Sequence, residues 1–126
     1  MNFEILTTSY FDTEAKKLAK RHRSFVNDLI SFQKSIVENP YQGVELAPGI
    51  RKIRMAIKSK GRGKSGGVRV ITLTFVVSET QGKVVLLLIY DKSDADSVRT
   101  DVVKEIVKEI GYDLNSLQIS PESNDS

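Results

Sequence analysis

The hairpin pattern in residues 51–77 constrains the fold of this chain more than any other feature. A turn-rich stretch, residues 40–49, leads into a segment where apolar and polar residues alternate, which predicts a strand with one apolar and one basic face. Four glycines within residues 59–67 exclude regular structure there, and the apolar segment 68–77 follows. We therefore predict a β-hairpin with a long mobile tip at residues 60–67. The expected apolar face is Ile53, Met55 and Ile57, and the expected basic face is Lys52, Arg54 and Lys58.

Three elements are expected in front of this hairpin. Residues 2–7 alternate apolar and polar side chains, which predicts a short edge strand. Asp12 or Thr13 can cap a first amphipathic helix, and Ser24 opens a second one, which ends before Pro40. Two amphipathic helices in sequence predict an αα-hairpin.

Two further elements are expected after the hairpin. Residues 83–90 are apolar nearly throughout, as in a central strand that is covered on both faces. Ser93 begins a capping-box pattern, and apolar residues at helical spacing continue to Gly111. The order β, α, α, β, β, β, α predicts one α+β domain over residues 1–118, with a small, largely antiparallel sheet. The polar residues 119–126 are expected to form a disordered tail.

Basic residues are concentrated in the first part of the hairpin. Of 19 Lys and Arg residues, eight lie between positions 51 and 69, where none of the 16 Asp and Glu residues occurs. A solvated charged face is the simpler interpretation, but eight cations on two strands and their loop repel one another. A field of this kind concentrates polyanions, and nucleic acid is the partner we expect. The eight are Arg51, Lys52, Arg54, Lys58, Lys60, Arg62, Lys64 and Arg69.

The composition excludes several kinds of chemistry. The chain has no cysteine, which excludes disulfides, thiolate zinc sites and cysteine nucleophiles and indicates a reducing compartment. His22 is the only histidine, which excludes two-histidine metal sites, so we expect no metal and no cofactor. No apolar run approaches the ~20 residues that span a bilayer, and we expect a cytoplasmic protein without membrane contact.

Four segments together resemble the toxins of the RelE/ParE superfamily, especially its HigB-like branch: Gly49–Arg54, residues 58–67, Val68–Ile71 and Leu88–Lys92. The resemblance covers roughly residues 3–110, and it implies a RelE-like fold. It also implies a toxin of a type II toxin-antitoxin system that cleaves mRNA on the ribosome and is inhibited by a cognate antitoxin. ParE-like members instead inhibit DNA gyrase without catalysis, and an RNA-binding module without cleavage is a further alternative, because fold alone does not separate these outcomes.

The resemblance also implies where RNA is cleaved. In such enzymes a strand lysine, a second basic residue two positions on and an arginine that opens the next strand surround the scissile phosphate. Lys52, Arg54 and Arg69 match these positions, and Lys92 lies near a further basic position. Attack by the RNA's own 2′-hydroxyl needs a base, stabilisation of the phosphorane and an acid, which crowded cations can supply without a metal ion. We assign Lys52 as base, Arg54 and Arg69 as phosphate clamps and Lys92 as acid or further clamp, and these roles can permute.

Two interpretations of Tyr90 stay open. It is either a core tyrosine whose hydroxyl reaches the sheet edge or a functional residue. RelE itself has a stacking tyrosine in its C-terminal segment, where this chain has Arg99 or its neighbours, so Tyr90 is our candidate for that role. The expected RNA-binding residues are Arg51, Lys58, Lys60, Arg62, Lys64 and Tyr90.

Overall fold

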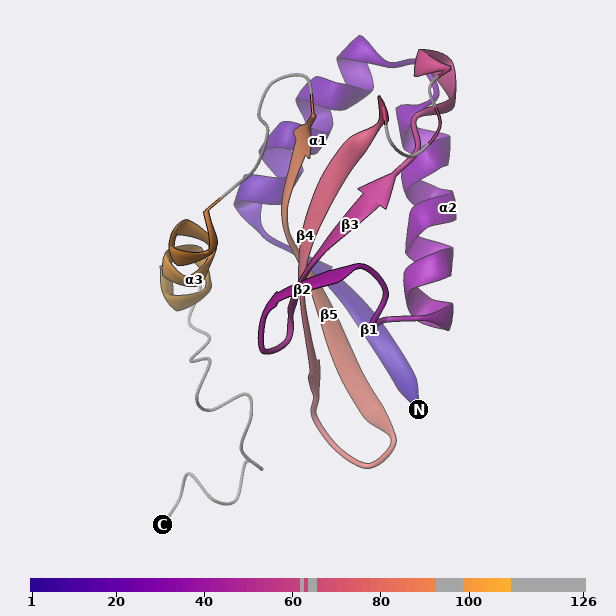
Figure 1. The fold of residues 1–126 in the computed structure, drawn as a ribbon. Coiled ribbons are helices and arrows are strands. Elements are labelled where there is room, and N and C mark those ends of the chain that lie inside the picture. Colours follow the sequence, from indigo (N-terminus) through magenta and orange to yellow (C-terminus); the bar gives the residue numbers. More distant parts are fainter. Residues whose placement is uncertain (62, 64–65, 93–98, 110–126) are drawn as a thin grey trace.

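The computed structural model describes residues 1–61, 63, 66–92 and 99–109. It contains one five-stranded sheet, two helices that precede most of the sheet in sequence, and a C-terminal helix (Figure 1). The predicted α+β architecture, with an N-terminal strand and a mostly antiparallel sheet, is therefore confirmed. The predicted helix cap at Ser93 and the predicted tail at 119–126 lie outside the described residues, and the C-terminal helix begins at Thr100 rather than at Ser93. No described helix is long and apolar enough to cross a membrane.

The N-terminal elements are strand β1 (Asn2–Thr7), helix α1 (Ser9–Arg21) and helix α2 (Phe25–Glu38). The edge strand and the end of α2 agree with the sequence, since Asn39 closes that helix and Pro40 follows it.

The predicted start of α1 is wrong, because Thr8 rather than Asp12 or Thr13 caps this helix. The Thr8 hydroxyl accepts a hydrogen bond from the Phe11 amide at 3.0 Å and donates one to the Leu87 carbonyl at 2.7 Å. Thr8 therefore caps the helix and also fastens it to a neighbouring strand. Asp12 lies in the first turn, where a negative charge complements the helix dipole.

The sheet has the strand order β1-β5-β4-β3-β2, in which only β1 pairs in parallel, with β5. Strands β4 (Val68–Val76) and β5 (Gln81–Asp91) are interior and largely buried, which confirms the prediction that the apolar segment 83–90 is covered on both faces. The middle position belongs to β4. Strand β2 (Val44–Ala47) was not predicted, since its four residues lie in the turn-rich stretch.

The first strand of the hairpin is shorter than the alternation of residues suggests. Strand β3 spans Ile50–Met55, and the short 3₁₀ helix η1 (Lys58–Lys60) follows it, so the prediction that Lys58 continues the strand is wrong. The reason is a tertiary contact, because an Asp28 carboxylate oxygen accepts the Lys58 amide at 3.0 Å and turns the chain toward α2. Ile57 remains fully buried, as its apolar character predicts.

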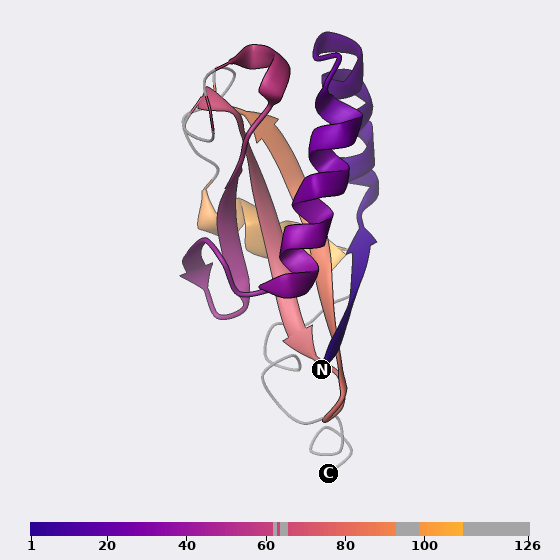
Figure 2. The same cartoon turned by 90° about the vertical axis from the view of Figure 1, so that its right-hand side faces the viewer.

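Two hydrophobic clusters cover the two faces of the sheet. The first lies under α1 and α2, and the second lies under helix α3 (Thr100–Glu109), on the side of the sheet opposite to α2 (Figure 2). A register shift between Ile71 and Thr72 leaves Leu87 as the extra residue of β5, and Leu87 packs in the second cluster. Helix α3 lies beside β5, and the Tyr10 hydroxyl ties it to α1 through Glu109.

Candidate nucleic-acid interface

Three site residues predicted from the sequence form one row across the sheet. Arg54 of β3 lies opposite Arg69 of β4, and Arg69 lies opposite Tyr90 of β5. Directly opposite residues of antiparallel strands share a face, so the three side chains leave the sheet on the same side. Lys52 shares this face, two positions from Arg54 along β3. We call Lys52, Arg54, Arg69 and Tyr90 the basic row.

The two arginines of the basic row differ in exposure. Arg54 is exposed, whereas Arg69 is 6% exposed and one of its guanidinium nitrogens lies 3.4 Å from the Val68 carbonyl oxygen. Like charges directly opposite each other in a sheet are destabilising, whereas a phosphate that binds both guanidinium groups gains two charge-assisted contacts. The row is therefore suited to bind a phosphate between β3 and β4.

Tyr90 fits the first of its two interpretations, a core tyrosine whose hydroxyl reaches the end of the sheet, and its functional role stays a prediction. Its side chain packs partly buried against the cluster under α3, and its hydroxyl is buried without a hydrogen-bond partner among the described residues. Burial raises the pKa of this phenol, and the Arg69 charge beside it lowers the pKa in part. Tyr90 therefore stays protonated at neutral pH and holds an unused hydroxyl next to Arg69.

Lys92 follows directly after β5 and is exposed. The end of β5 lies against the start of β4, because Val68 pairs with Asp91. Lys92 is thus at the same end of the sheet as Arg69, and no ion pair holds it among the described residues. Arg62 and Lys64, both predicted to bind RNA, lie outside those residues.

Lys60 differs from the expectation that it belongs to the open tip. Its ammonium nitrogen lies 3.0 and 3.2 Å from the two carboxylate oxygens of Asp91, which is 2% exposed. The side chain of Lys60 is itself only 17% exposed, and His22 Nε2 lies 3.5 Å from the same carboxylate. Lys60 therefore forms an internal ion pair that fastens the base of the glycine-rich loop to the end of β5.

Arg51 also differs from the expectation that it belongs to the RNA-binding residues, because it lies on the opposite face of β3 from the basic row. Its guanidinium group lies over the Tyr41 ring, 5.1 Å from the ring centroid, and 3.4 Å from a Glu45 carboxylate oxygen. Both contacts hold it at the far end of the sheet from the loop. The structure therefore does not bring Arg51 together with the other predicted site residues.

Helix η1 is fastened at its other side by α2. The Ser59 amide donates to the Ser24 hydroxyl at 2.9 Å, and Asp28 accepts both that hydroxyl and the Lys58 amide. The Lys58 side chain itself stays exposed. Asp28 and Asp91 are acidic neighbours whose contacts with the basic segment were not predicted, since both are distant from that segment in sequence. The only available signal was the position of Asp91 at the end of an apolar run.

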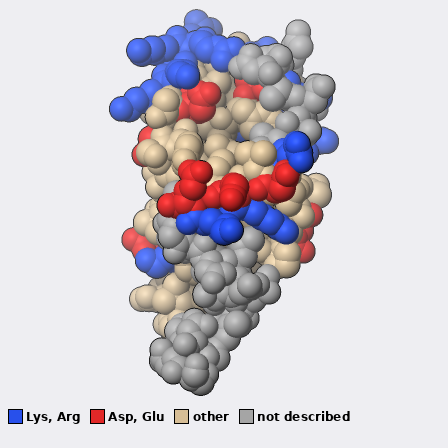
Figure 3. All heavy atoms as spheres, turned by 90° about the vertical axis from the view of Figure 1, so that its left-hand side faces the viewer, with Lys and Arg blue, Asp and Glu red and all other residues tan. Residues whose placement is uncertain are grey.

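Charge is unevenly distributed on the side of the molecule that carries α3. Lys and Arg side chains gather at the upper end of this side, and a band of mixed charge lies at the height of α3 (Figure 3). Exposed residues of α3 supply both signs, including Asp101, Lys104, Glu105 and Lys108.

Neither the models of known protein families nor a search of curated proteins gave a match to this chain. Among the described residues, no three His, Cys, Asp or Glu side chains lie close enough together to hold a metal ion.

Proposed function

We propose that this protein is a ribosome-dependent mRNA endoribonuclease, the toxin of a type II toxin-antitoxin system with a RelE-like fold of the HigB-like branch. The observation that carries the proposal is the register of β3 and β4, which sets Arg54 opposite Arg69 with Lys52 on the same face. The sequence resemblance of these segments to RelE/ParE toxins supports it. Its partners would be mRNA on the ribosome and a cognate antitoxin, in the cytoplasm.

The proposed reaction uses the RNA's own 2′-hydroxyl as nucleophile. The two arginines bind the scissile phosphate and stabilise the charge that develops on its oxygens as the phosphorane forms. Lys52, about 7 Å along the strand from Arg54, accepts the proton of the 2′-hydroxyl. Lys92, at the same end of the sheet as Arg69, donates a proton to the leaving 5′-oxygen. The products are a 2′,3′-cyclic phosphate and a free 5′-hydroxyl.

The test is cleavage of ribosome-bound mRNA by the purified protein in EDTA. We expect cuts that leave a cyclic or 3′-phosphate, and we expect a 2′-deoxy sugar at the cut to block them. Arg69→Ala should abolish most cleavage, Arg69→Lys should restore part of it, and Lys83→Ala is the control, because Lys83 pairs with Glu4 at 3.3 Å outside the basic row. A folded Arg69→Ala protein that cleaves normally would refute the site assignment.

Two further assays, one of translation and DNA gyrase activity and one of RNA binding at different salt concentrations, separate the alternatives. Translation that continues while DNA gyrase is blocked would favour a ParE-like inhibitor. Salt-sensitive binding of RNA without any cut would favour an RNA-binding module.

A further inference from the structure

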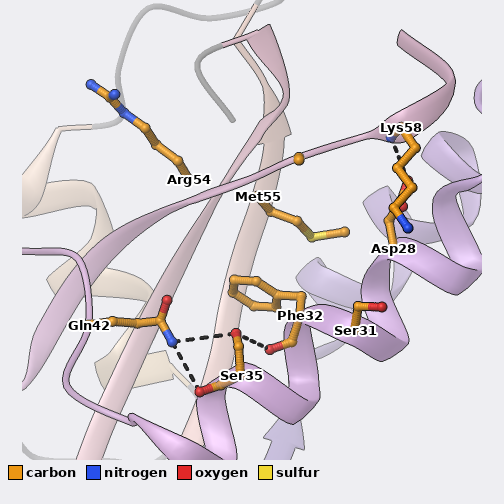
Figure 4. A pocket seen from close by; sticks show the side chains of 9 residues that line it. Asp28, Ser31, Phe32, Ser35, Gln42, Arg54, Met55 and Lys58 are labelled. Carbon is orange, nitrogen blue, oxygen red and sulfur yellow. Dashed lines mark hydrogen bonds between the residues drawn. The ribbon is translucent and has the colours of Figure 1, made fainter. Parts of the chain in front are cut away.

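A hollow of about 210 Å³ lies between α2 and the last residues of β3 (Figure 4). Strand β2 pairs only with Ile50–Lys52, so the edge of β3 beyond Lys52 has no neighbouring strand among the described residues. Phe32 and Met55 give the hollow an apolar wall, and both are largely buried. A flat, apolar ring can therefore enter beside an open strand edge.

Gln42 places a fixed hydrogen-bond acceptor at one end of this hollow. Its amide nitrogen donates to the Ser35 carbonyl at 3.2 Å and to the Asn39 carbonyl at 3.1 Å. Two carbonyl partners fix the orientation of the amide, because its oxygen cannot donate to either of them. The Gln42 carbonyl oxygen is consequently directed away from Ser35 and has no hydrogen-bond partner among the described residues (Figure 4).

Asp28 supplies a second acceptor at the opposite end. Its Oδ2 accepts the Ser24 hydroxyl at 2.6 Å and the Lys58 amide at 3.0 Å. Its Oδ1 has no partner in the part of the chain that the structure describes, although the residue is 6% exposed. These bonds hold the carboxylate in place, so the hollow combines an apolar wall with two fixed acceptors.

The hollow adjoins the basic row at Arg54. Met55 points toward α2, whereas the Arg54 side chain points away from it on the other side of the strand (Figure 4). Lys58 lies at the Asp28 end and adds a second cation to the lining. A nucleotide whose phosphate binds Arg54 can therefore pass round the open edge of β3 and place its base in the hollow.

We propose that this hollow is a subsite for an unstacked nucleobase that carries an exocyclic amino group, which is adenine, cytosine or guanine. The amino group donates to Gln42 Oε1 or Asp28 Oδ1, and the ring packs on Phe32 and Met55. Uracil is disfavoured because it has no exocyclic amino group and offers the two fixed acceptors only its single ring N–H. The subsite rests on the proposed function only for the location of the phosphate at Arg54.

The test is an NMR titration of the free protein with the 5′-monophosphates of adenosine, cytidine, guanosine and uridine. We expect the amide signals of Ser31, Gln42 and Met55 to shift with the first three nucleotides. We expect uridine monophosphate to bind about fivefold more weakly, which is the effect of one lost hydrogen bond. Ser31 lines the hollow on an exposed turn of α2, so Ser31→Leu fills the space and should remove these shifts. Gln33→Leu, on the opposite side of α2, is the control that should keep them.

Equal binding of all four nucleotides, or shifts that persist in Ser31→Leu, would overturn the subsite. Nucleotide binding that follows the expected order in a protein that cuts no RNA would refute the endoribonuclease and leave the subsite standing. Cleavage of ribosome-bound mRNA without any of these shifts would refute the subsite and leave the endoribonuclease standing.

Discussion

Two groups of cations within the same basic segment differ in whether the fold gives them an acidic partner. Lys52, Arg54 and Lys58 have no acidic partner among the described residues, whereas Arg51 is paired with Glu45 and Lys60 with Asp91. The partners of the second group come from elsewhere in the chain. A run of basic residues in a sequence is therefore not one binding surface, because tertiary contacts decide which charges remain available for a ligand.

The largest expected effect contrasts two arginines of one strand. Arg54→Ala should slow cleavage of ribosome-bound mRNA by about 100- to 1000-fold, the cost of removing one donor that stabilises a developing charge. Arg51→Ala, on the opposite face of β3, should leave the rate nearly unchanged. Rate measurements with both variants check this, and equal losses would contradict the division of the two groups.

The second prediction concerns the stability of the Lys60–Asp91 pair. Asp91→Asn should lower the free energy of unfolding by about 3 kcal/mol, because it leaves a largely buried ammonium group without its counter-charge. Urea unfolding measures this loss. Adding Lys60→Met should restore part of it, and losses that simply add would show that the two side chains do not interact.

The third prediction compares lysines by the salt dependence of RNA binding. Each phosphate contact changes the slope of log affinity against log salt by about 0.7 to 0.9. Lys58→Met should therefore reduce the slope by roughly that amount, whereas Lys60→Met should leave it unchanged. A reduced slope for Lys60→Met would mean that Lys60 leaves Asp91 to bind RNA.

The smallest effect is expected at Tyr90. Tyr90→Phe removes a buried hydroxyl without a partner, so the free energy of unfolding should change by no more than about 1 kcal/mol at neutral pH. Because the folded-state pKa of this phenol is raised above 10.0, the stability that it contributes is present below pH 10 and is lost as the pH rises further. Unfolding curves of the two proteins should diverge above pH 10, with the wild type losing more stability.

Local patterns predicted most of the secondary structure. The alternation in β1 and β3, the helical spacing that ends at Asn39 and the apolar run of β5 each depend on a contrast between neighbouring residues, and each of these elements forms. Strand β2 was not predicted, because four residues flanked by a proline and glycines are too few to show a clear alternation of apolar and polar side chains. The cap of α1 was predicted wrongly, because a hydrogen bond to Leu87, which is distant in sequence, favours Thr8 over Asp12 and Thr13.

The sequence by itself determined that many basic residues lie on and around one hairpin. It also determined that Lys52 and Arg54 lie on the same face of their strand, because apolar and polar residues alternate there. Only the tertiary structure decided the rest, because register and ion pairs join residues that are distant along the chain. The register set Arg54 opposite Arg69 and Arg69 opposite Tyr90. The packing brought Asp28 and Asp91 against the base of the loop, where a buried carboxylate is stable only with partners such as Lys60 and the Lys58 amide.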